Sequence, residues 1–216
     1  MKVFAHRGFS HKYPEATRSA YEGAIEVNAD GLECDIRLTK DQIPVCFHDR
    51  NLKRIAGVSK PVAKLTLREL QELTDVITLR ELVKLADKKD KELLIETKHP
   101  SRFGRGVENA VLSEIEGKSK ITVMSFSLLA VLWLRKRIRS TGYVVAHRWR
   151  LLFIPTEIVA IDFQLFNRSR WARKRLSKKI VFLWTINDVK EIKFPKKIEG
   201  VISDKPDLPF FLLSSR

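Results

Sequence analysis

The 216-residue chain has few of the features that mark secreted or membrane-spanning proteins. It contains only Cys34 and Cys46, which excludes the disulfide framework of small secreted domains. Its longest nearly apolar stretch, Ile121–Leu134, is interrupted by Thr and Ser and is too short to span a bilayer. The first residues lead directly into an expected strand, which argues against a signal peptide. We therefore expect a cytoplasmic protein, at most peripheral to a membrane.

Linkers and repeats are also absent from the sequence. No stretch rich in Pro, Gly or Ser divides the chain, and no internal repeat is visible. A chain of this length can bury a substantial core. We expect a single domain over residues 1–216.

Acidic residues are scarce in one part of the chain. Residues 132–180 carry 13 Lys and Arg against 2 Asp and Glu, a balance of +11, whereas residues 1–50 carry 7 against 8, a balance of −1. Such a basic segment attracts phosphates, whether of nucleic acid, an anionic lipid surface or a phosphorylated substrate. The alternative is a cationic face that only contacts solvent.

Short β-like runs alternate with helix-like runs along the whole chain, which favours a parallel α/β architecture. The expected helices lie near residues 17–27, 67–73, 79–86, 107–116, 127–139, 170–177 and 189–192. Eight strands are expected at Val3–Ala5, Gly31–Leu38, Leu93–Lys98, Ile121–Ser125, Tyr143–Ala146, Ile158–Phe163, Ile180–Ile186 and Val201–Ser203, with Pro44–His48 as an extra hairpin arm. The best fit is a TIM-type (β/α)8 barrel with some reduced helices and a small hairpin insertion after the second strand. A doubly wound open sheet is the alternative.

Unusual polar residues fall where these strands end, which is where barrel enzymes place their reactive groups. They are His6 and Arg7 after the first strand, Glu33 and Asp35 on the second, His48 and Asp49 after the hairpin arm, Glu96 and Lys98 on the third, Trp184 on the seventh, and Ser203 and Asp204 on the eighth. Their convergence predicts an active site for an anionic substrate.

The spacing of the carboxylates indicates a metal site. Glu33 and Asp35 are two residues apart, so both face the same side of a strand, and Glu96 would supply a third oxygen. Ligand sets made only of oxygen favour Mg²⁺ or Ca²⁺ over zinc. The alternative is that the pair forms structural salt bridges with Arg37 or Arg7.

These residues also carry a family resemblance. The segments "AHRG", "PEAT", "GLECDIRLTKDQIPVCFHDRNLKRIAG", "LLIETK", "FLWTIND" and "GVISDKPD" resemble, in order and spacing, the motifs of the glycerophosphodiester phosphodiesterase family. The resemblance extends from residue 3 to about residue 207. It implies a TIM-type barrel, a divalent cation (Mg²⁺ or Ca²⁺, with Mn²⁺ as a further candidate) and hydrolysis of small glycerophosphodiesters to glycerol phosphate and an alcohol.

The resemblance also implies a role for each site residue. His6 and His48 match the acid/base pair, which we assign as base and acid respectively. Three carboxylates match the metal ligands: Glu33, Asp35 and Glu96. The phosphate-binding positions are matched by Arg7 and Lys98. The substrate pocket is matched by Glu15 and Trp184.

The sequence departs from the family pattern at three positions. Ala16 stands where Asn is usual, although Thr17 could still cap the following helix. Gln42 replaces the usual Gly, so we expect the hairpin turn to differ, and Lys205 replaces a common aromatic residue in the last loop. None of these is a predicted ligand or proton-transfer residue.

Two other functions are compatible with parts of the sequence. A phospholipase D acting on lysophospholipids or sphingolipids could use a similar barrel, with the basic segment 132–180 against an anionic membrane. A non-catalytic nucleic-acid-binding protein could use the same segment, but that function leaves Glu33, Asp35 and Glu96 unexplained. The sequence indicates no oligomeric state.

Side-chain alternation gives an expectation for the cysteines. With Glu33 and Asp35 facing the site, Cys34 faces away, whereas Cys46 is two residues before His48 and is expected to share its face. We therefore expect two unbonded thiols on opposite faces.

Overall fold

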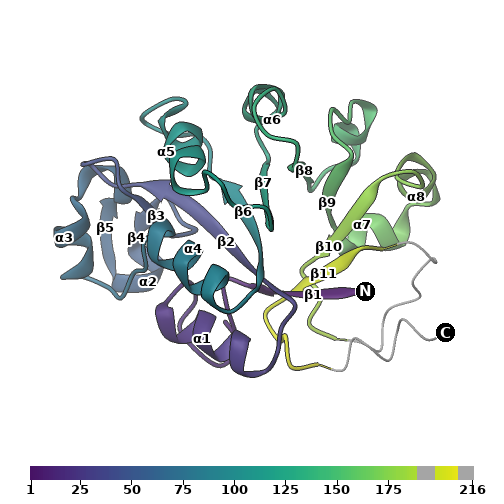
Figure 1. Ribbon diagram of the computed structural model, residues 1–216. Helices are drawn as coiled ribbons and strands as arrows, with labels where there is room; N and C mark the ends of the chain where they lie inside the picture. Colours follow the sequence, from purple (N-terminus) through teal and green to yellow (C-terminus); the bar gives the residue numbers. More distant parts are fainter. Residues whose placement is uncertain (189–197, 209–216) are drawn as a thin grey trace.

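A closed barrel of eight parallel strands forms the centre of the computed structural model, which describes residues 1–188 and 198–208 (Figure 1). The strands are β1 Lys2–His6, β2 Gly31–Leu38, β6 Glu92–Thr97, β7 Ile121–Ser125, β8 Thr141–Val145, β9 Ile158–Asp162, β10 Ile180–Trp184 and β11 Gly200–Ser203. Each pairs in parallel with the next, and β11 pairs with β1 to close the ring. The predicted TIM-type barrel is confirmed, and the open sheet is wrong.

Helices and short helical turns connect the strands around the outside of the barrel (Figure 1). They are α1 Arg18–Glu26, α4 Leu79–Lys88, α5 Gly106–Glu114, α6 Leu128–Leu134, η2 Arg148–Leu152, α7 Phe163–Arg168 and α8 Arg170–Arg175. Between β8 and β9 only the 3-10 turn η2 remains, which is the reduction expected from the short chain. The helix expected at 189–192 lies outside the described residues.

Two details of these connections differ from or add to the sequence expectation. Helix α7 was not expected: β9 ends at Asp162, whose carboxylate accepts the Leu165 N–H at 2.8 Å and so starts a helix where a strand end was predicted. Thr17 does cap α1, because its hydroxyl accepts the Ala20 N–H.

None of the helices in the described ranges combines the length and the apolarity needed to cross a bilayer.

The insertion after β2 is confirmed and is larger than one hairpin. Strand β3 (Pro44–Cys46) pairs antiparallel with β2, and it is followed by β4 Asn51–Leu52, α2 Lys53–Ala56, β5 Val58–Pro61, η1 Val62–Lys64 and α3 Leu67–Gln71. Strands β4 and β5 pair as a second small sheet. The insertion buries its own apolar cluster, which includes Phe47, Leu52 and Leu70. The pairing of β3 with residues 36–38 places the insertion at the carboxyl end of β2.

Side chains that alternate along the strands fill the barrel below the polar end. Phe4, Leu94, Met124, Val144, Ala160, Phe182 and Ile202 form the interior cluster, one from each of seven strands. The Phe4 and Phe182 rings meet edge to face with centroids 5.3 Å apart. Gly31 leaves room for them, because a Cβ there would lie 2.3 Å from the Phe4 ring. The interior is therefore closed below the site.

The two cysteines are free, but the expectation of opposite faces is wrong. Both belong to the apolar layer between the barrel and its helices, and burial, together with a hydrogen bond to Cys46, raises the pKa of Cys34. Strand β3 ends at Cys46, with Cys46 opposite Ile36 on β2. His48 lies beyond the regular strand, so alternation from His48 gave Cys46 the wrong face.

Gln42, which stands where the family resemblance leads us to expect Gly, has a backbone conformation that favours glycine. Its φ is +61°, in the left-handed region that costs a residue with a side chain about 1–2 kcal/mol. The residue is exposed, so its side chain adds little packing. We expect Gln42→Gly to raise the free energy of unfolding by about 1 kcal/mol in denaturant titration. Lys40→Gly is the control in the same turn, at negative φ, and should destabilise; a destabilised Gln42→Gly would contradict this account.

Candidate active site

Three buried carboxylates meet at the carboxyl end of the barrel. Glu33 and Asp35 extend from β2 and Glu96 from β6, and the parallel register places Asp35 opposite Glu96. Each offers an oxygen within 4.8 Å of the other two. The three residues are only 3, 2 and 7% exposed. The structure thus brings all three expected ligands together.

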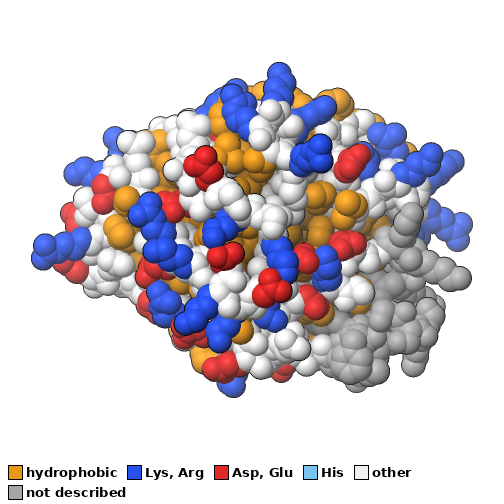
Figure 2. All heavy atoms as spheres, in the orientation of Figure 1, with side chains coloured by type: hydrophobic (Ala, Val, Ile, Leu, Met, Phe, Trp, Pro, Cys, Tyr) orange, Lys and Arg blue, Asp and Glu red, His pale blue; other side chains and the backbone are white. Residues whose placement is uncertain are grey.

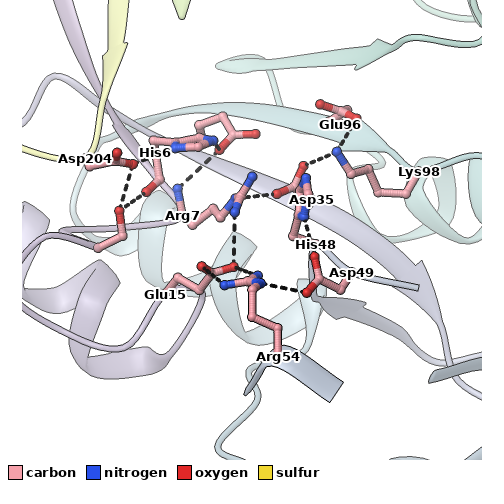
Figure 3. A network of polar contacts seen from close by, with 12 residues as sticks. His6, Arg7, Glu15, Asp35, His48, Asp49, Arg54, Glu96, Lys98 and Asp204 are labelled. Carbon is pink, nitrogen blue, oxygen red and sulfur yellow. Dashed lines mark hydrogen bonds and ion pairs between the residues drawn. The ribbon is translucent and has the colours of Figure 1, made fainter. Parts of the chain in front are cut away.

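Two cations of the chain contact this cluster, mainly at Asp35 (Figure 3). Arg7 Nε lies 2.8 Å from Asp35 Oδ2, and Lys98 Nζ lies 2.9 Å from Asp35 Oδ1 and 2.6 Å from Glu96 Oε1. Glu33 accepts the backbone N–H of Arg7 at 3.2 Å, and among the described residues its one partner at salt-bridge distance is His6 Nε2, at 4.0 Å. The salt bridge weighed for Arg7 exists, whereas no carboxylate within residues 1–188 and 198–208 pairs with Arg37, which donates to the His48 carbonyl oxygen.

A tight turn after β1 allows Arg7 to point back into the barrel. Arg7 has φ +55° and Gly8 has φ +80°. A Cβ on Gly8 would lie 2.5 Å from the Ala20 carbonyl carbon of α1, so only glycine fits between the turn and the helix. An arginine held in the left-handed region beside reactive groups is local strain of the kind found at functional sites.

The two glutamates of the cluster ionise less readily than free carboxyl groups, whereas Asp35 ionises more readily. Burial, reinforced by the charge of Asp35, raises the pKa of Glu33 to about 7 and that of Glu96 to about 8. Burial also opposes ionisation of Asp35, but Lys98 and Arg7 outweigh it and lower that pKa to about 2. A nearby divalent cation would favour the ionised form of both glutamates, and three converging oxygen donors suit a hard ion of this kind. The residues present therefore fit such an ion.

His6 is oriented by the last strand of the barrel. Its Nδ1 lies 2.6 Å from Asp204 Oδ1, which also accepts the Ser10 hydroxyl at 3.0 Å. The ring thereby directs Nε2 toward Glu33. Burial disfavours the charged ring, but the hydrogen bond to Asp204 and the charge of Glu33 outweigh it, so the pKa of His6 is raised.

His48 is held in the same manner from the insertion. Its Nδ1 lies 2.7 Å from Asp49 Oδ1, and its ring lines the same cavity as His6. Here burial dominates and lowers the pKa of His48. Two imidazoles with oppositely shifted pKa values thus border one cavity.

A chain of ion pairs joins the two halves of the site through Glu15 (Figure 3). Glu15 accepts from Arg7 Nη1 at 3.1 Å and from both terminal nitrogens of Arg54 at 2.7 Å. Arg54 Nε donates to Asp49 Oδ2 at 2.7 Å, and Asp49 holds His48. Glu15, expected in the substrate pocket, therefore contacts the guanidinium group of Arg7. It also contacts that of Arg54, which binds the carboxylate that holds His48.

The cavity at the centre has one polar and one apolar wall. It is about 100 Å³ in volume and is lined by the carboxylates, both histidines, Arg7 and Lys98 on one side. The other side consists of Met124, Phe126, Val144, Ala160, Trp184 and Ile202. The Trp184 ring packs edge to face on Phe126 at 5.7 Å, and its buried indole N–H has no acceptor in the described residues. Trp184 can therefore offer a ligand an apolar face.

A second cavity, of about 240 Å³, adjoins the first at Lys98. The insertion and the loop after β6 form its walls, which carry five cations and no carboxylate: Arg37, Arg50, Lys64, Lys98 and Arg102. Positive charge therefore surrounds the approach to the site from this side.

Sequence reasoning placed Asp49 and Asp204 at strand ends but gave them no role, and it passed over Arg54 and Ser10. For the two aspartates a signal was available in the sequence: Asp49 follows a histidine in "FHDR", and Asp204 ends the last strand in "ISDKP". Their contacts identify them as positioning residues for His48 and His6.

Asp204→Asn should expose this positioning role. We expect kcat to fall by about 10², because the amide no longer fixes the tautomer of His6. Because Asp204 raises the pKa of His6, its loss should lower that pKa and move the acidic limb of the kcat/KM profile to lower pH if His6 acts as the base. Asp207→Asn, in the same loop but exposed, is the control. An unchanged pH profile in Asp204→Asn would contradict the assignment.

Comparison with known proteins gives consistent matches over nearly the whole chain. Residues 6–208 match the model of the Glycerophosphoryl diester phosphodiesterase family. A "Probable glycerophosphodiester phosphodiesterase 1" of Mycobacterium tuberculosis is 30% identical over 91% of this chain and 85% of that protein. The crystal structure of a glycerophosphodiester phosphodiesterase from Thermotoga maritima, also 30% identical, superposes with a TM-score of 0.85 over 98% of both chains.

A further solved structure, of lower sequence identity, has the same fold. An Oleispira antarctica phosphodiesterase, described in complex with the product sn-glycerol-3-phosphate, is 23% identical, with a TM-score of 0.80 over 96% of this chain and 94% of that chain.

Proposed function

This chain belongs to the glycerophosphoryl diester phosphodiesterase family and is a glycerophosphodiester phosphodiesterase, and we propose that it uses a divalent cation and a histidine pair to release glycerol phosphate and an alcohol. One observation carries this mechanism. A single cavity is bordered by three carboxylates, two cationic side chains and two histidines. Each group has a task in the hydrolysis of a phosphate diester.

Arg7 and Lys98 are proposed to hold the phosphodiester. Both line the cavity and approach Asp35 from opposite oxygens, so their nitrogens border the space above that carboxylate. Negative charge on the phosphoryl oxygens grows as the new oxygen–phosphorus bond forms, and fixed positive charge in a buried site stabilises it strongly. The glycerol would lie against Trp184, which belongs to the apolar wall of the cavity.

Two proton transfers complete the reaction. A base takes the proton of the attacking oxygen as its bond to phosphorus forms, and an acid protonates the departing alkoxide as the second bond breaks. Imidazoles suit both tasks near neutral pH. We propose His6 as the base, oriented by Asp204, and His48 as the acid, oriented by Asp49.

Glu33, Asp35 and Glu96 are the residues that would hold the cation. When bound, a divalent ion would polarise the phosphoryl oxygens and add positive charge to the site. Mg²⁺ and Ca²⁺ suit this all-oxygen donor set, and Mn²⁺ is a further candidate.

The proposed partners are a small glycerophosphodiester and, through the basic segment 132–180, an anionic membrane surface. The product named for the Oleispira antarctica enzyme, sn-glycerol-3-phosphate, supports the first proposal by analogy. Family membership accounts for the acidic cluster, which a nucleic-acid-binding function leaves unexplained. A lysophospholipid is the second candidate substrate. The apolar wall of the cavity, which includes Phe126, favours it because such a wall can contact an acyl chain.

Product analysis tests the proposed reaction. Glycerophosphocholine incubated with the enzyme should yield glycerol phosphate and choline in equal amounts, because the proposed reaction breaks the phosphate ester bond on the choline side and leaves the phosphate on the glycerol. Asp35→Asn protein, prepared identically, is the control for contaminating hydrolases. Release of phosphocholine and glycerol instead would contradict the proposal.

A further inference from the structure

Four large hydrophobic side chains are far more exposed than any others in the described residues. Leu129 and Leu152 are each 72% exposed, Trp149 63% and Phe153 55%. The next most exposed, Ile180, reaches only 42%. Single exposed apolar residues are common, but a group of the largest exposures in one region marks an interaction surface.

All four residues lie on connections that leave the carboxyl ends of neighbouring strands. Leu129 is in the first turn of α6, directly after β7, and the other three lie in or next to η2, after β8. Strands β7 and β8 are paired, so the two connections are adjacent at the barrel mouth. The reactive groups leave the barrel at this same end.

Arg150 ties these two connections together and to the catalytic cavity. Its Nη1 donates to the Phe126 carbonyl oxygen and to the Tyr143 hydroxyl, the latter at 3.1 Å. Phe126 lines the cavity and packs on Trp184. The exposed apolar group is therefore joined to the apolar wall of the active site.

The sequence around this group is strongly cationic. Between Gly117 and Thr156 the sequence has no Asp or Glu and eight Lys and Arg. Arg150 stacks on the Trp149 ring at 4.9 Å, and Arg148 lies over the Trp171 ring at 5.2 Å. On the face in Figure 2, hydrophobic side chains lie open next to α6 and are bordered by Lys and Arg.

We propose that this surface, formed by Leu129, Trp149, Leu152 and Phe153 with their arginine neighbours, docks the active-site mouth onto an anionic lipid bilayer. Apolar and aromatic tips enter the boundary between headgroups and acyl chains, while Arg and Lys contact lipid phosphates. Charge complementarity selects the bilayer as the partner. The mouth then faces glycerophosphodiesters that retain an acyl chain, a substrate class that rests on the proposed function, whereas docking itself does not.

Vesicle binding tests the docking. The full-length protein should sediment with vesicles of phosphatidylglycerol and phosphatidylcholine, not with pure phosphatidylcholine, and binding should weaken steeply with salt. The double variant Trp149→Ala/Leu152→Ser should bind at least tenfold more weakly at every salt concentration, because two inserting side chains are lost. Leu73→Ser, an apolar residue 39% exposed near α3, is the matched control and should bind normally.

Turnover of two substrates separates this inference from the proposed function. The double variant should hydrolyse soluble glycerophosphocholine at the wild-type rate and lysophosphatidylcholine in anionic vesicles at least tenfold more slowly. Leu129→Ser, on a different element, should show the same pattern more weakly and guards against misfolding of the double variant. Equal binding to neutral vesicles, or undiminished binding by both variants, would overturn the inference. So would salt-dependent binding to duplex DNA without vesicle binding, which would assign the surface to nucleic acid.

Discussion

Asp35→Asn should lower kcat for glycerophosphocholine by at least ~10³, more than the 10–100-fold typical of residues in the outer shell of a metal site. Asp35 lies at the centre of the site, where it contacts Arg7 and Lys98. Its carboxylate is close enough to those of Glu33 and Glu96 for all three to bind one ion. The amide retains the shape but removes the charge that holds both the proposed cation and the phosphate-binding side chains. Glu33→Gln should lose activity to a similar extent. Steady-state release of glycerol phosphate measures both.

Stability distinguishes loss of a ligand from loss of the fold. The pKa of Glu33 is about 4.5 in the unfolded chain and about 7 in the folded protein. Ionisation of Glu33 therefore lowers the free energy of unfolding as the pH rises through this range, by on the order of 3 kcal/mol once the pH is above 7. In chelator at pH 8, Glu33→Gln should therefore melt above the wild type, and the difference should vanish near pH 4. Glu108→Gln, a buried carboxylate outside the site, should retain turnover. Active Asp35→Asn, or inactive Glu108→Gln, would contradict the role of the cluster.

His6→Ala and His48→Ala should each lower kcat by at least ~10², the scale of a lost general acid or base. The two rings border one cavity, and each is held by its own carboxylate, Asp204 or Asp49. The reaction thus loses one of its two proton transfers in each variant. Metal binding, measured by titration calorimetry, should remain, because neither histidine belongs to the carboxylate cluster.

A substrate with a good leaving group assigns the two roles. A glycerophosphodiester of nitrophenol needs no acid, so the acid variant should recover most of its activity and the base variant should not. We expect His48→Ala to be rescued. Rescue of His6→Ala would reverse the roles and make His6 the acid and His48 the base. The raised pKa of His6 and the lowered pKa of His48 favour this reversed assignment. Rescue of both variants would contradict an acid/base pair.

The fold and the carboxylate cluster could be predicted because both depend on local patterns. Alternating strand and helix signals specify a parallel barrel, and the two-residue spacing in "ECD" and "ETK" specifies which side chains share a face. The parallel register then does the rest, because it sets Asp35 opposite Glu96. Nothing beyond strand direction was needed to bring these residues together.

The positioning contacts could not be predicted because they depend on closure of the barrel and on the insertion. His6 and Asp204 are 198 residues apart and meet only because β11 pairs with β1. Arg54 reaches Glu15 across 39 residues from α2, a helix with no clear signal in the sequence. Cys46 was misplaced for a related reason: β3 ends before His48, and the chain leaves the alternation on which the expectation relied.

Dependence on a divalent cation is the most direct test of the account. Wild-type enzyme should release glycerol phosphate from glycerophosphocholine, lose this activity after treatment with EDTA, and regain it on addition of Mg²⁺, Ca²⁺ or Mn²⁺ at the carboxylate cluster of Glu33, Asp35 and Glu96. Asp35→Asn should stay inactive under all three metals. Full activity of the wild type in EDTA would contradict the metal site and the mechanism built on it.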